Sequence, residues 1–343
     1  MRRGCSPDEN VLPCAITYGE HAVSRILVTG ASGFVGSHVV PAFIERGHVV
    51  AALVRSEEAG AKVLGRLPHN QRSSVELRSG DVTRPETLSA ALRGVDAVLH
   101  LVAIPRDWDG GSTLRRVNAE GTRNVVEGAR AGGIRRFLHQ AALGVMDDPQ
   151  LHYASSKAKG EQIVAESDLD WTIFKPSLLW GERDGFFNII AGLIRFSPGV
   201  VPIPGSGSSR FQPLWVHDLA RVIVTALERP EAVRSTYELG GPRYWTYREI
   251  AQEILRSMGA HRLILPMPVP LISLVARGAE SAHIPFPVAS DQLRQLRLDN
   301  VGRLDSVESD FGFAPADMAG QLGYLRRRRR DQEPILSEIH GGR

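Results

Sequence analysis

Short apolar runs alternate with longer amphipathic segments from residue 25 to about residue 176. The runs have the length and the β-branched or aromatic content of strands, and most are apolar throughout, which is typical of parallel strands buried on both faces. They predict strands at Ile26–Thr29, Val49–Val54, Val75–Leu77, Ala97–Val102, Phe137–His139 and Trp171–Phe174.

The segments between these runs carry apolar residues three and four positions apart, as helices with one buried face do. Helices are therefore predicted at Phe34–Arg46, Glu57–Leu67, Glu86–Leu92, Leu114–Ala131 and Tyr153–Glu166. Strict alternation of strand and helix predicts an α/β fold, a doubly wound parallel (Rossmann) sheet. One local rule is broken, because Pro41 inside the first helix removes a backbone hydrogen bond and should bend that helix.

The composition of the chain changes after Pro176, where Gly and Pro become frequent. Helices are predicted at Val216–Leu227 and Tyr247–Met258, separated by irregular segments. We expect a nucleotide-binding domain over residues 25–176 and a smaller C-terminal substrate lobe over 177–325, with a strand near 237–240 returning to the main sheet. Residues 1–24 are expected to be a disordered arm, and 326–343 a basic, disordered tail.

Composition narrows the class of protein. A chain of 343 residues with 43% apolar and 23% charged residues is neither a disordered chain nor a fibre. The net charge of +3 comes from the run Arg326–Arg330, so a nucleic-acid-binding face is not expected. Both cysteines, Cys5 and Cys14, precede the folded body, which favours a reducing cytoplasm. The apolar stretch Leu263–Ala276 is too short and too rich in proline to cross a bilayer, although contact with a membrane surface stays open.

A glycine-rich turn follows the first predicted strand and opens the first helix. Gly30 permits the sharp turn, Gly33 lets the backbone approach a pyrophosphate, and Gly36 allows close packing of helix on strand, while the N–H groups and dipole of the helix start hold the anion. The predicted dinucleotide contacts in this turn are Gly30, Ser32, Gly33, Phe34, Val35 and Gly36.

The end of the second strand bears on the choice of cofactor. Val54 stands where a carboxylate would bind the ribose of NAD, and Arg55 follows with a guanidinium that suits a 2′-phosphate. NADP is therefore the predicted cofactor, with NAD as the alternative if Arg55 is an ordinary loop arginine. After the third strand, Asp81 is placed to bond the adenine amino group and Val82 to pack on the ring.

Tyr153 and Lys157 form the predicted catalytic pair. Their i, i+4 spacing places both on one face of the helix after the fifth strand. The positive charge is expected to lower the pKa of the Tyr153 phenol from its usual value of about 10 and so make it a proton donor or acceptor.

With these features, the chain resembles the short-chain dehydrogenase/reductase superfamily in its extended or atypical branch, which is similar to NAD-dependent epimerases and dehydratases. Within that branch it resembles the stand-alone bacterial relatives of the nucleotide-binding accessory subunit of respiratory complex I. The resemblance covers about residues 25–325. Besides the glycine turn and the Tyr153/Lys157 pair, it depends on Asn118–Asn124, Lys175–Ser177, Phe211–Asp218 and Tyr237–Pro242.

The resemblance implies NAD(P)(H) in the crevice, with Lys157 also bonding the nicotinamide ribose and Asn118 packed near the active-site helix. It places Val102, Ala103 and Pro176 among the cofactor contacts. One departure concerns the end of the fifth strand, where active members carry Ser or Thr and this chain has Ala141-Ala142. A donor to the substrate carbonyl is then missing unless Gln140 or Ser155 replaces it.

The substrate side is less defined. Arg210 stands near the place where extended relatives hold a nucleotide-sugar with an arginine, and Arg183 and Arg195 are other cationic candidates. Phe187 and neighbouring aromatic residues fit either an apolar substrate, such as an isoprenoid or quinone, or simple core packing. Two further groups have structural interpretations: His217-Asp218 as a helix N-terminus, and His100 as a buried strand residue. No cluster with metal-ligand spacing occurs, so no metal is expected.

These observations favour an NADP(H)-dependent oxidoreductase or epimerase-like enzyme that acts on a hydroxyl or carbonyl group of an unknown substrate, for which an apolar small molecule is a candidate. The alternative is a non-catalytic nucleotide-binding subunit that stabilises or assembles a membrane-associated complex. The expected location is the cytoplasm, with peripheral contact at the inner face of the membrane as a variant. Oligomeric state does not follow from the sequence.

Overall fold

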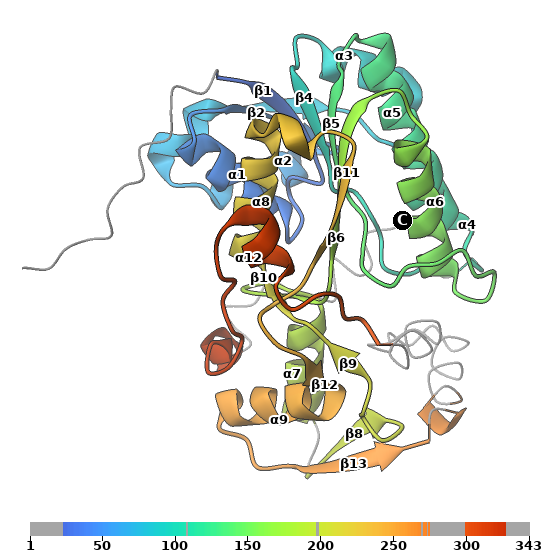
Figure 1. The fold of residues 1–343 in the computed structure, drawn as a ribbon, viewed down its shortest axis with the longest axis vertical. Helices are drawn as coiled ribbons and strands as arrows, with labels where there is room; N and C mark the ends of the chain where they lie inside the picture. Colours follow the sequence, from blue (N-terminus) through green and yellow to red (C-terminus); the bar gives the residue numbers. More distant parts are fainter. Residues whose placement is uncertain are drawn as a thin grey trace, which may run out of the picture.

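Seven parallel strands form the central sheet, in the order β11-β6-β5-β4-β1-β2-β3 (Figure 1). The computed structural model describes residues 23–107, 109–196, 199–268, 270–272, 274 and 299–326. The chain leaves β1 toward β2 and β3, then returns to the other side through β4, β5 and β6. This doubly wound order confirms the predicted fold class. The strands are β1 (Arg25–Thr29), β2 (Val49–Val54), β3 (Val75–Ser79), β4 (Ala97–His100), β5 (Arg136–Gln140), β6 (Asp170–Pro176) and β11 (Ser235–Leu239).

Helices cover both faces of the sheet because successive strand residues point to opposite sides. Ile26 and Val28 belong to one core cluster and Leu27 to the other. The first face carries α1 (Gly36–Glu45), α2 (Glu57–Gly65), α8 (Val216–Glu228) and α12 (Ser306–Phe311). The second carries α3 (Leu88–Leu92), α5 (Gly121–Ala131) and α6 (His152–Ala165). Short helical segments link them: η1 (His69–Ser74), η2 (Pro85–Thr87), α4 (Ser112–Leu114), the π-helix η3 (Arg115–Glu120) and η4 (Pro230–Ala232).

A smaller lobe lies beyond one end of the sheet, at the bottom of Figure 1, with its own apolar core. Helix α9 (Tyr247–Met258) begins with a capping box, in which the side chains of Thr246 and Glu249 each accept the backbone N–H of the other. Its C-cap is Gly259, whose φ is 64°. The helices of the lobe are α7 (Phe186–Phe196), α9 (Tyr247–Met258) and η5 (Leu322–Arg326). Its strands are β7 (Leu179–Trp180), β8 (Val200–Pro204), β9 (Arg210–Phe211), β10 (Leu214–Trp215), β12 (Trp245–Thr246) and β13 (Leu263–Met267).

Some expectations about the ends of elements differ from the structure. The strand predicted to reach Val102 ends at His100. Pro41 lies inside α1, and the helix continues past it to Glu45. Most of the expected arm at 1–24 and tail at 326–343 lies outside the described residues. Within the described parts of the chain, no helix is long and apolar enough to cross a membrane.

Candidate functional site

The glycine turn joins β1 to α1 with almost no room for side chains. Gly30 has a φ of 74°, and the Gly33 N–H donates to its carbonyl at 3.0 Å. A Cβ on Gly36 would lie 2.3 Å from the Gly30 carbonyl oxygen and 2.7 Å from the Ala31 Cα. No side chain caps the N-terminus of α1. The turn therefore combines a close-packed backbone with a helix start whose dipole favours an anion, which fits a dinucleotide pyrophosphate.

Two arginines follow β2 and the helix after it, α2. Arg55 directly follows β2 and is exposed, and no hydrogen bond or ion pair is recorded for it among the described residues. Ser56 next to it caps α2 by accepting from the Ala59 N–H at 3.2 Å. Arg66, at the end of α2, donates to the Ser32 carbonyl at 2.5 Å. Of these two arginines, Arg66 contacts the glycine turn directly, while Arg55 lies at the end of the strand next to β1.

The segment after β3 is ordered by its own hydrogen bonds. Thr83 donates to Asp81 Oδ1 from both its N–H and its hydroxyl, each at 2.8 Å. Asn124 donates to the Val82 carbonyl at 2.8 Å, and only 4% of Val82 is exposed. The Val82 side chain also contacts the position of Gly121 in α5. Asp81 is therefore held at the carboxyl end of β3, while Val82 offers little open surface to a ring.

A buried polar chain connects the glycine turn to the middle of the π-helix. The Thr29 hydroxyl accepts the Val102 N–H at 3.4 Å and lies 2.8 Å from His100 Nδ1. His100 Nε2 lies 3.0 Å from the Thr122 hydroxyl, which donates to the Asn118 carbonyl at 2.7 Å. Nε2 is therefore the protonated nitrogen, since Thr122 already uses its proton. Burial, with Lys157 adding to it, lowers the pKa of His100 to about 3, so the ring is neutral.

Asn118 holds the loop after β4 against α6. Its side chain donates to the Ile104 carbonyl and to the Ser156 hydroxyl, each at 3.0 Å, and accepts the Ile104 N–H at 2.8 Å. Ala103 precedes this anchor and is exposed. Asn118 thus packs near α6 through one hydrogen bond to Ser156 and two to the Ile104 backbone.

Tyr153 and Lys157 lie in the first two turns of α6. Lys157 is 5% exposed, and its ammonium donates to the Gln140 carbonyl at 2.6 Å, at the end of β5. Burial lowers the pKa of Lys157 to about 8, partly opposed by Glu161. Burial raises the pKa of Tyr153. The expected lowering of the Tyr153 pKa by Lys157 is therefore wrong for this structure, because the ammonium is bonded to a carbonyl and desolvation of the phenol dominates.

The end of β5 has no hydroxyl to help Tyr153. Ala141 is buried, and Ala142 offers only a methyl group. Ser155 does not replace the missing donor, since its hydroxyl donates to Asp147 at 2.5 Å. The side-chain oxygen of Gln140 is buried without a hydrogen-bond partner among the described residues. The Pro176 carbonyl, at the end of the adjacent β6, accepts the Leu143 N–H at 3.0 Å, so Pro176 lies at the same edge of the sheet.

Two buried histidines, His100 and His139, lie side by side, although no sequence pattern linked them. The rings of His100 and His139 stack 5.5 Å apart at 15°, from adjacent positions of β4 and β5. Neither nitrogen of His139 has a hydrogen-bond partner among the described residues, and burial lowers its pKa well below the usual value, with Lys157 adding to the effect. Their proximity follows from strand register, which only the folded sheet reveals.

The residues predicted for the substrate side are placed differently from expectation. Phe187 is fully buried in the core of the C-terminal lobe, so it is a packing residue and not the lining of an open site. Arg210 is exposed but pairs with Asp299, its Nη2 lying 2.7 Å from Oδ2, and its guanidinium lies 5.6 Å from the Tyr244 ring centre. Asp299 is 89 positions away, and no sequence pattern linked the two.

The remaining candidates have structural contacts. Asp218 lies in the first turn of α8, as expected, but it accepts the Ala316 N–H at 2.7 Å and does not cap the helix, whose N-cap is Trp215. His217 lies 3.1 Å from His38 on α1. Arg183 donates to the Ser37 hydroxyl at 3.2 Å. The described residues contain no group of three or more metal-ligating side chains.

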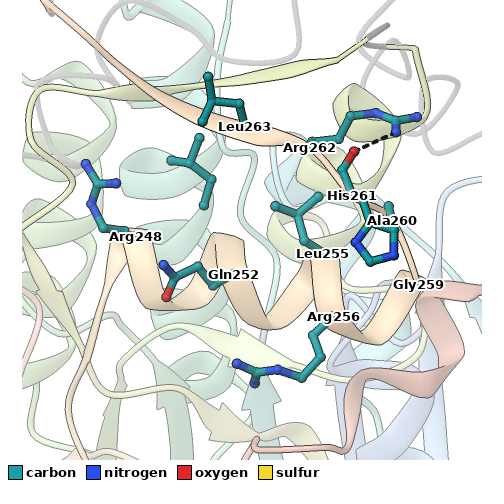
Figure 2. Close-up of a pocket in the computed structure, with 10 residues that line it drawn as sticks. Arg248, Gln252, Leu255, Arg256, Gly259, Ala260, His261, Arg262 and Leu263 are labelled. Carbon is teal, nitrogen blue, oxygen red and sulfur yellow. Dashed lines mark hydrogen bonds between the residues drawn. The ribbon is translucent and has the colours of Figure 1, made fainter.

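Two cavities accompany these contacts. One of about 290 Å³ lies between the loops that follow β4 and β5, and His152, the neighbour of Tyr153, lines it with Arg115 and Lys159. Another, of about 800 Å³, lies far from this edge, between α9 and β13 in the C-terminal lobe (Figure 2). The smaller cavity lies next to α6, where Ser155 and Ser156 also line it, but Tyr153, Lys157 and the glycine turn are not among its lining residues.

Fold and site together define a nucleotide-binding protein of the short-chain dehydrogenase/reductase class. A family model described as NAD(P)H-binding matches residues 30–202, and one described as the RmlD substrate binding domain matches residues 145–289. The chain belongs to the NAD(P)H-binding family, in the extended branch that includes epimerases and dehydratases.

Relatives in this family have different functions. The chain is 26% identical over 311 residues to subunit 9 of the NADH dehydrogenase 1 alpha subcomplex from Arabidopsis thaliana mitochondria, covering 88% of this chain and 76% of the relative. It is 30% identical over 253 residues to a ceramide reductase from Caulobacter vibrioides, covering 71% of this chain and 74% of the relative. A dTDP-glucose 4,6-dehydratase from Streptomyces venezuelae, solved with NAD bound, has the same fold, with a TM-score of 0.69, 23% identity, and 91% and 99% of the two chains covered.

Proposed function

We propose that the protein is an NADP(H)-dependent oxidoreductase that reduces a carbonyl group, with residues 25–176 binding the cofactor and residues 177–325 contributing to the substrate side. The observation that carries the proposal is the position of Tyr153 and Lys157 at the carboxyl edge of the sheet. There, Lys157 is bonded to the end of β5, and the glycine turn lies two strands away.

The glycine turn fits a nicotinamide dinucleotide, because Gly36 packs the start of α1 tightly on the turn and no side chain caps the N–H groups expected to hold the pyrophosphate. When bound, the reduced nicotinamide supplies a hydride to the carbonyl carbon. Tyr153 supplies the proton to the carbonyl oxygen, since its phenol is protonated at neutral pH. The burial that raises its pKa also makes it a weaker acid. Lys157, held at the end of β5, would orient the nicotinamide ribose.

Arg55 supports NADP over NAD. It is exposed at the end of β2, where the 2′-phosphate of NADP lies in this fold. The neighbouring residue is Val54, so the carboxylate that would bind the ribose of NAD is missing. A charge-assisted bond to the phosphate contributes about 1.5–3 kcal/mol, or about 10- to 100-fold in affinity.

A second candidate function is a nucleotide-binding subunit without catalysis. Ala141 and Ala142 favour it, since the donor that polarises the substrate carbonyl is absent. The relationship to a subunit of mitochondrial NADH dehydrogenase supports the same candidate. Under either function we place the protein in the cytoplasm, in peripheral contact with the inner face of the membrane.

Calorimetry with NADPH and NADH, followed by NADPH oxidation over a panel of carbonyl compounds that includes long-chain ketones and quinones, tests the proposal. We expect NADPH to bind more tightly than NADH, and Arg55→Gln to weaken NADPH about 10- to 100-fold while leaving NADH unchanged. Tyr153→Phe should keep cofactor affinity and lose turnover. Tight NADPH binding without turnover on any carbonyl, unchanged by Tyr153→Phe, would favour the non-catalytic subunit.

A further inference from the structure

The loop between β7 and α7, residues 181–185, belongs to the C-terminal lobe but lies against the first turn of α1. A Cβ on Gly181 would lie 3.7 Å from Phe34 Cε2 in the glycine turn. Arg183 Nη2 donates to the Ser37 hydroxyl at 3.2 Å, and that hydroxyl donates to the Phe34 carbonyl at 2.7 Å. The second lobe therefore reaches the segment on which the dinucleotide is expected to rest.

Arg183 has a backbone conformation that residues with a Cβ rarely adopt. Its φ is 71°, and among the described residues only Arg234 is another non-glycine residue with a positive φ. Glycine is the residue that fits this conformation without strain. The backbone therefore favours glycine at this position, which leaves the guanidinium as the group that distinguishes Arg183.

Buried hydrogen bonds hold the loop in this conformation. Asp184 is fully buried, and its Oδ1 accepts the Phe187 N–H at 2.7 Å. Its Oδ2 accepts the Tyr324 hydroxyl at 2.5 Å and the Gly181 N–H at 3.4 Å. Because these bonds join the loop to α7 and η5, Arg183 is placed at α1 before any ligand binds, and little conformational entropy is lost on binding.

The ion pair recorded for Arg183 is one that a phosphate can displace. The Glu182 carboxylate lies 3.9 Å from Nη1, and the two side chains are 46% and 40% exposed, so the pair is weak. Arg183 has other contacts as well, so ligand binding would be an exchange of partners. A diphosphate carries two negative charges and can accept parallel hydrogen bonds from a guanidinium, which favours that exchange.

The glycine turn has no charged side chain of its own. Residues 30–36 contain neither an acidic nor a basic residue, and no side chain caps α1. Its N–H groups and the helix dipole offer a diphosphate only partial positive charge. Arg66 brings one guanidinium to the turn from α2, and Arg183 brings a second from the C-terminal lobe.

We propose that Arg183 binds the diphosphate of the nicotinamide dinucleotide, so that the C-terminal lobe contributes directly to the cofactor site. The inference rests on the dinucleotide binding of the proposed function, but it does not depend on catalysis. It assigns Arg183 to the cofactor and not to the substrate, for which its position in the sequence made it a candidate.

Calorimetry of the full-length protein with NADPH, NADH and ADP-ribose tests the inference. Because the diphosphate is common to the three nucleotides, Arg183→Gly should weaken each of them by about 10- to 100-fold. Arg55→Gln, in contrast, should weaken only NADPH, which alone carries a 2′-phosphate. Glycine fits the left-handed backbone, so the urea midpoint of Arg183→Gly should equal that of the parent.

Arg234→Gly is the matched control. It removes the other arginine with a positive φ (56°), which precedes β11 at the amino edge of the sheet and bonds the Asp168 carbonyl at 3.3 Å. All three affinities should stay as in the parent, because the glycine turn lies at the carboxyl edge.

Several results would overturn the inference. One is unchanged affinity in Arg183→Gly, and another is a loss confined to NADPH, which would place Arg183 at the 2′-phosphate. A raised KM for a carbonyl substrate with unchanged nucleotide affinity would assign Arg183 to the substrate side instead. Equal losses in Arg234→Gly would mean a general effect on folding. A parent that binds none of the nucleotides overturns the proposed function itself, and this inference with it.

Discussion

At the scale of single residues, Gly36 shows how little space the phosphate-binding turn leaves. A Cβ there would press on the backbone of Gly30 and Ala31, which no rotamer change relieves. We expect Gly36→Ala to abolish NADPH binding in calorimetry and to lower the free energy of unfolding by about 2–3 kcal/mol.

Gly192→Ala is the matched control, because nothing lies within 4 Å of a Cβ at that position in α7. The control should be stabilised by about 0.5–1 kcal/mol. Equal losses in both variants would contradict this account.

At the scale of elements, the π-helix η3 is joined to the loop after β4 by Asn118. Asn118→Ala removes both hydrogen bonds to the half-buried Ile104 backbone and the one to the Ser156 hydroxyl, so we expect a loss of about 2–3 kcal/mol in urea unfolding. Weaker NADPH binding should accompany it, since the loop borders the crevice. Thr113→Ala removes an exposed hydrogen bond to Asp109 and should cost less than about 1 kcal/mol. Comparable losses in the two variants would show that burial of the Asn118 contacts is unimportant.

At the scale of the whole molecule, buried neutral histidines set the response to acid. Burial lowers the pKa of His38 to about 4, with the nearby His217 and Arg183 adding to it, and burial lowers the pKa of His100 to about 3. The unfolded chain, with histidine pKa values of about 6.5, then binds more protons, so stability falls as pH decreases from about 6.5 toward 4. Asp184 acts oppositely between about pH 4 and 7, because burial raises its pKa to about 7.

A single substitution isolates the histidine contribution from that of Asp184. In His38→Gln, the free energy of unfolding should fall by about 2 kcal/mol less than in the parent between pH 6.5 and 4. Urea unfolding at several pH values in this window measures the difference. Parallel curves for the two proteins would mean that folding does not lower the pKa of His38.

The sequence alone determined the sheet and its nucleotide-binding turn, because both depend on local signals: continuous apolar runs, helical periodicity and glycines at fixed spacing. The predicted bounds of β2 and α9 agree with the structure residue for residue. Tertiary structure alone decided which partners polar groups have. Arg210 pairs with Asp299, His139 stacks on His100, and Lys157 bonds the Gln140 carbonyl. Such contacts depend on strand register and on loops distant in the chain, and desolvation at those places reversed the expected pKa shift of Tyr153.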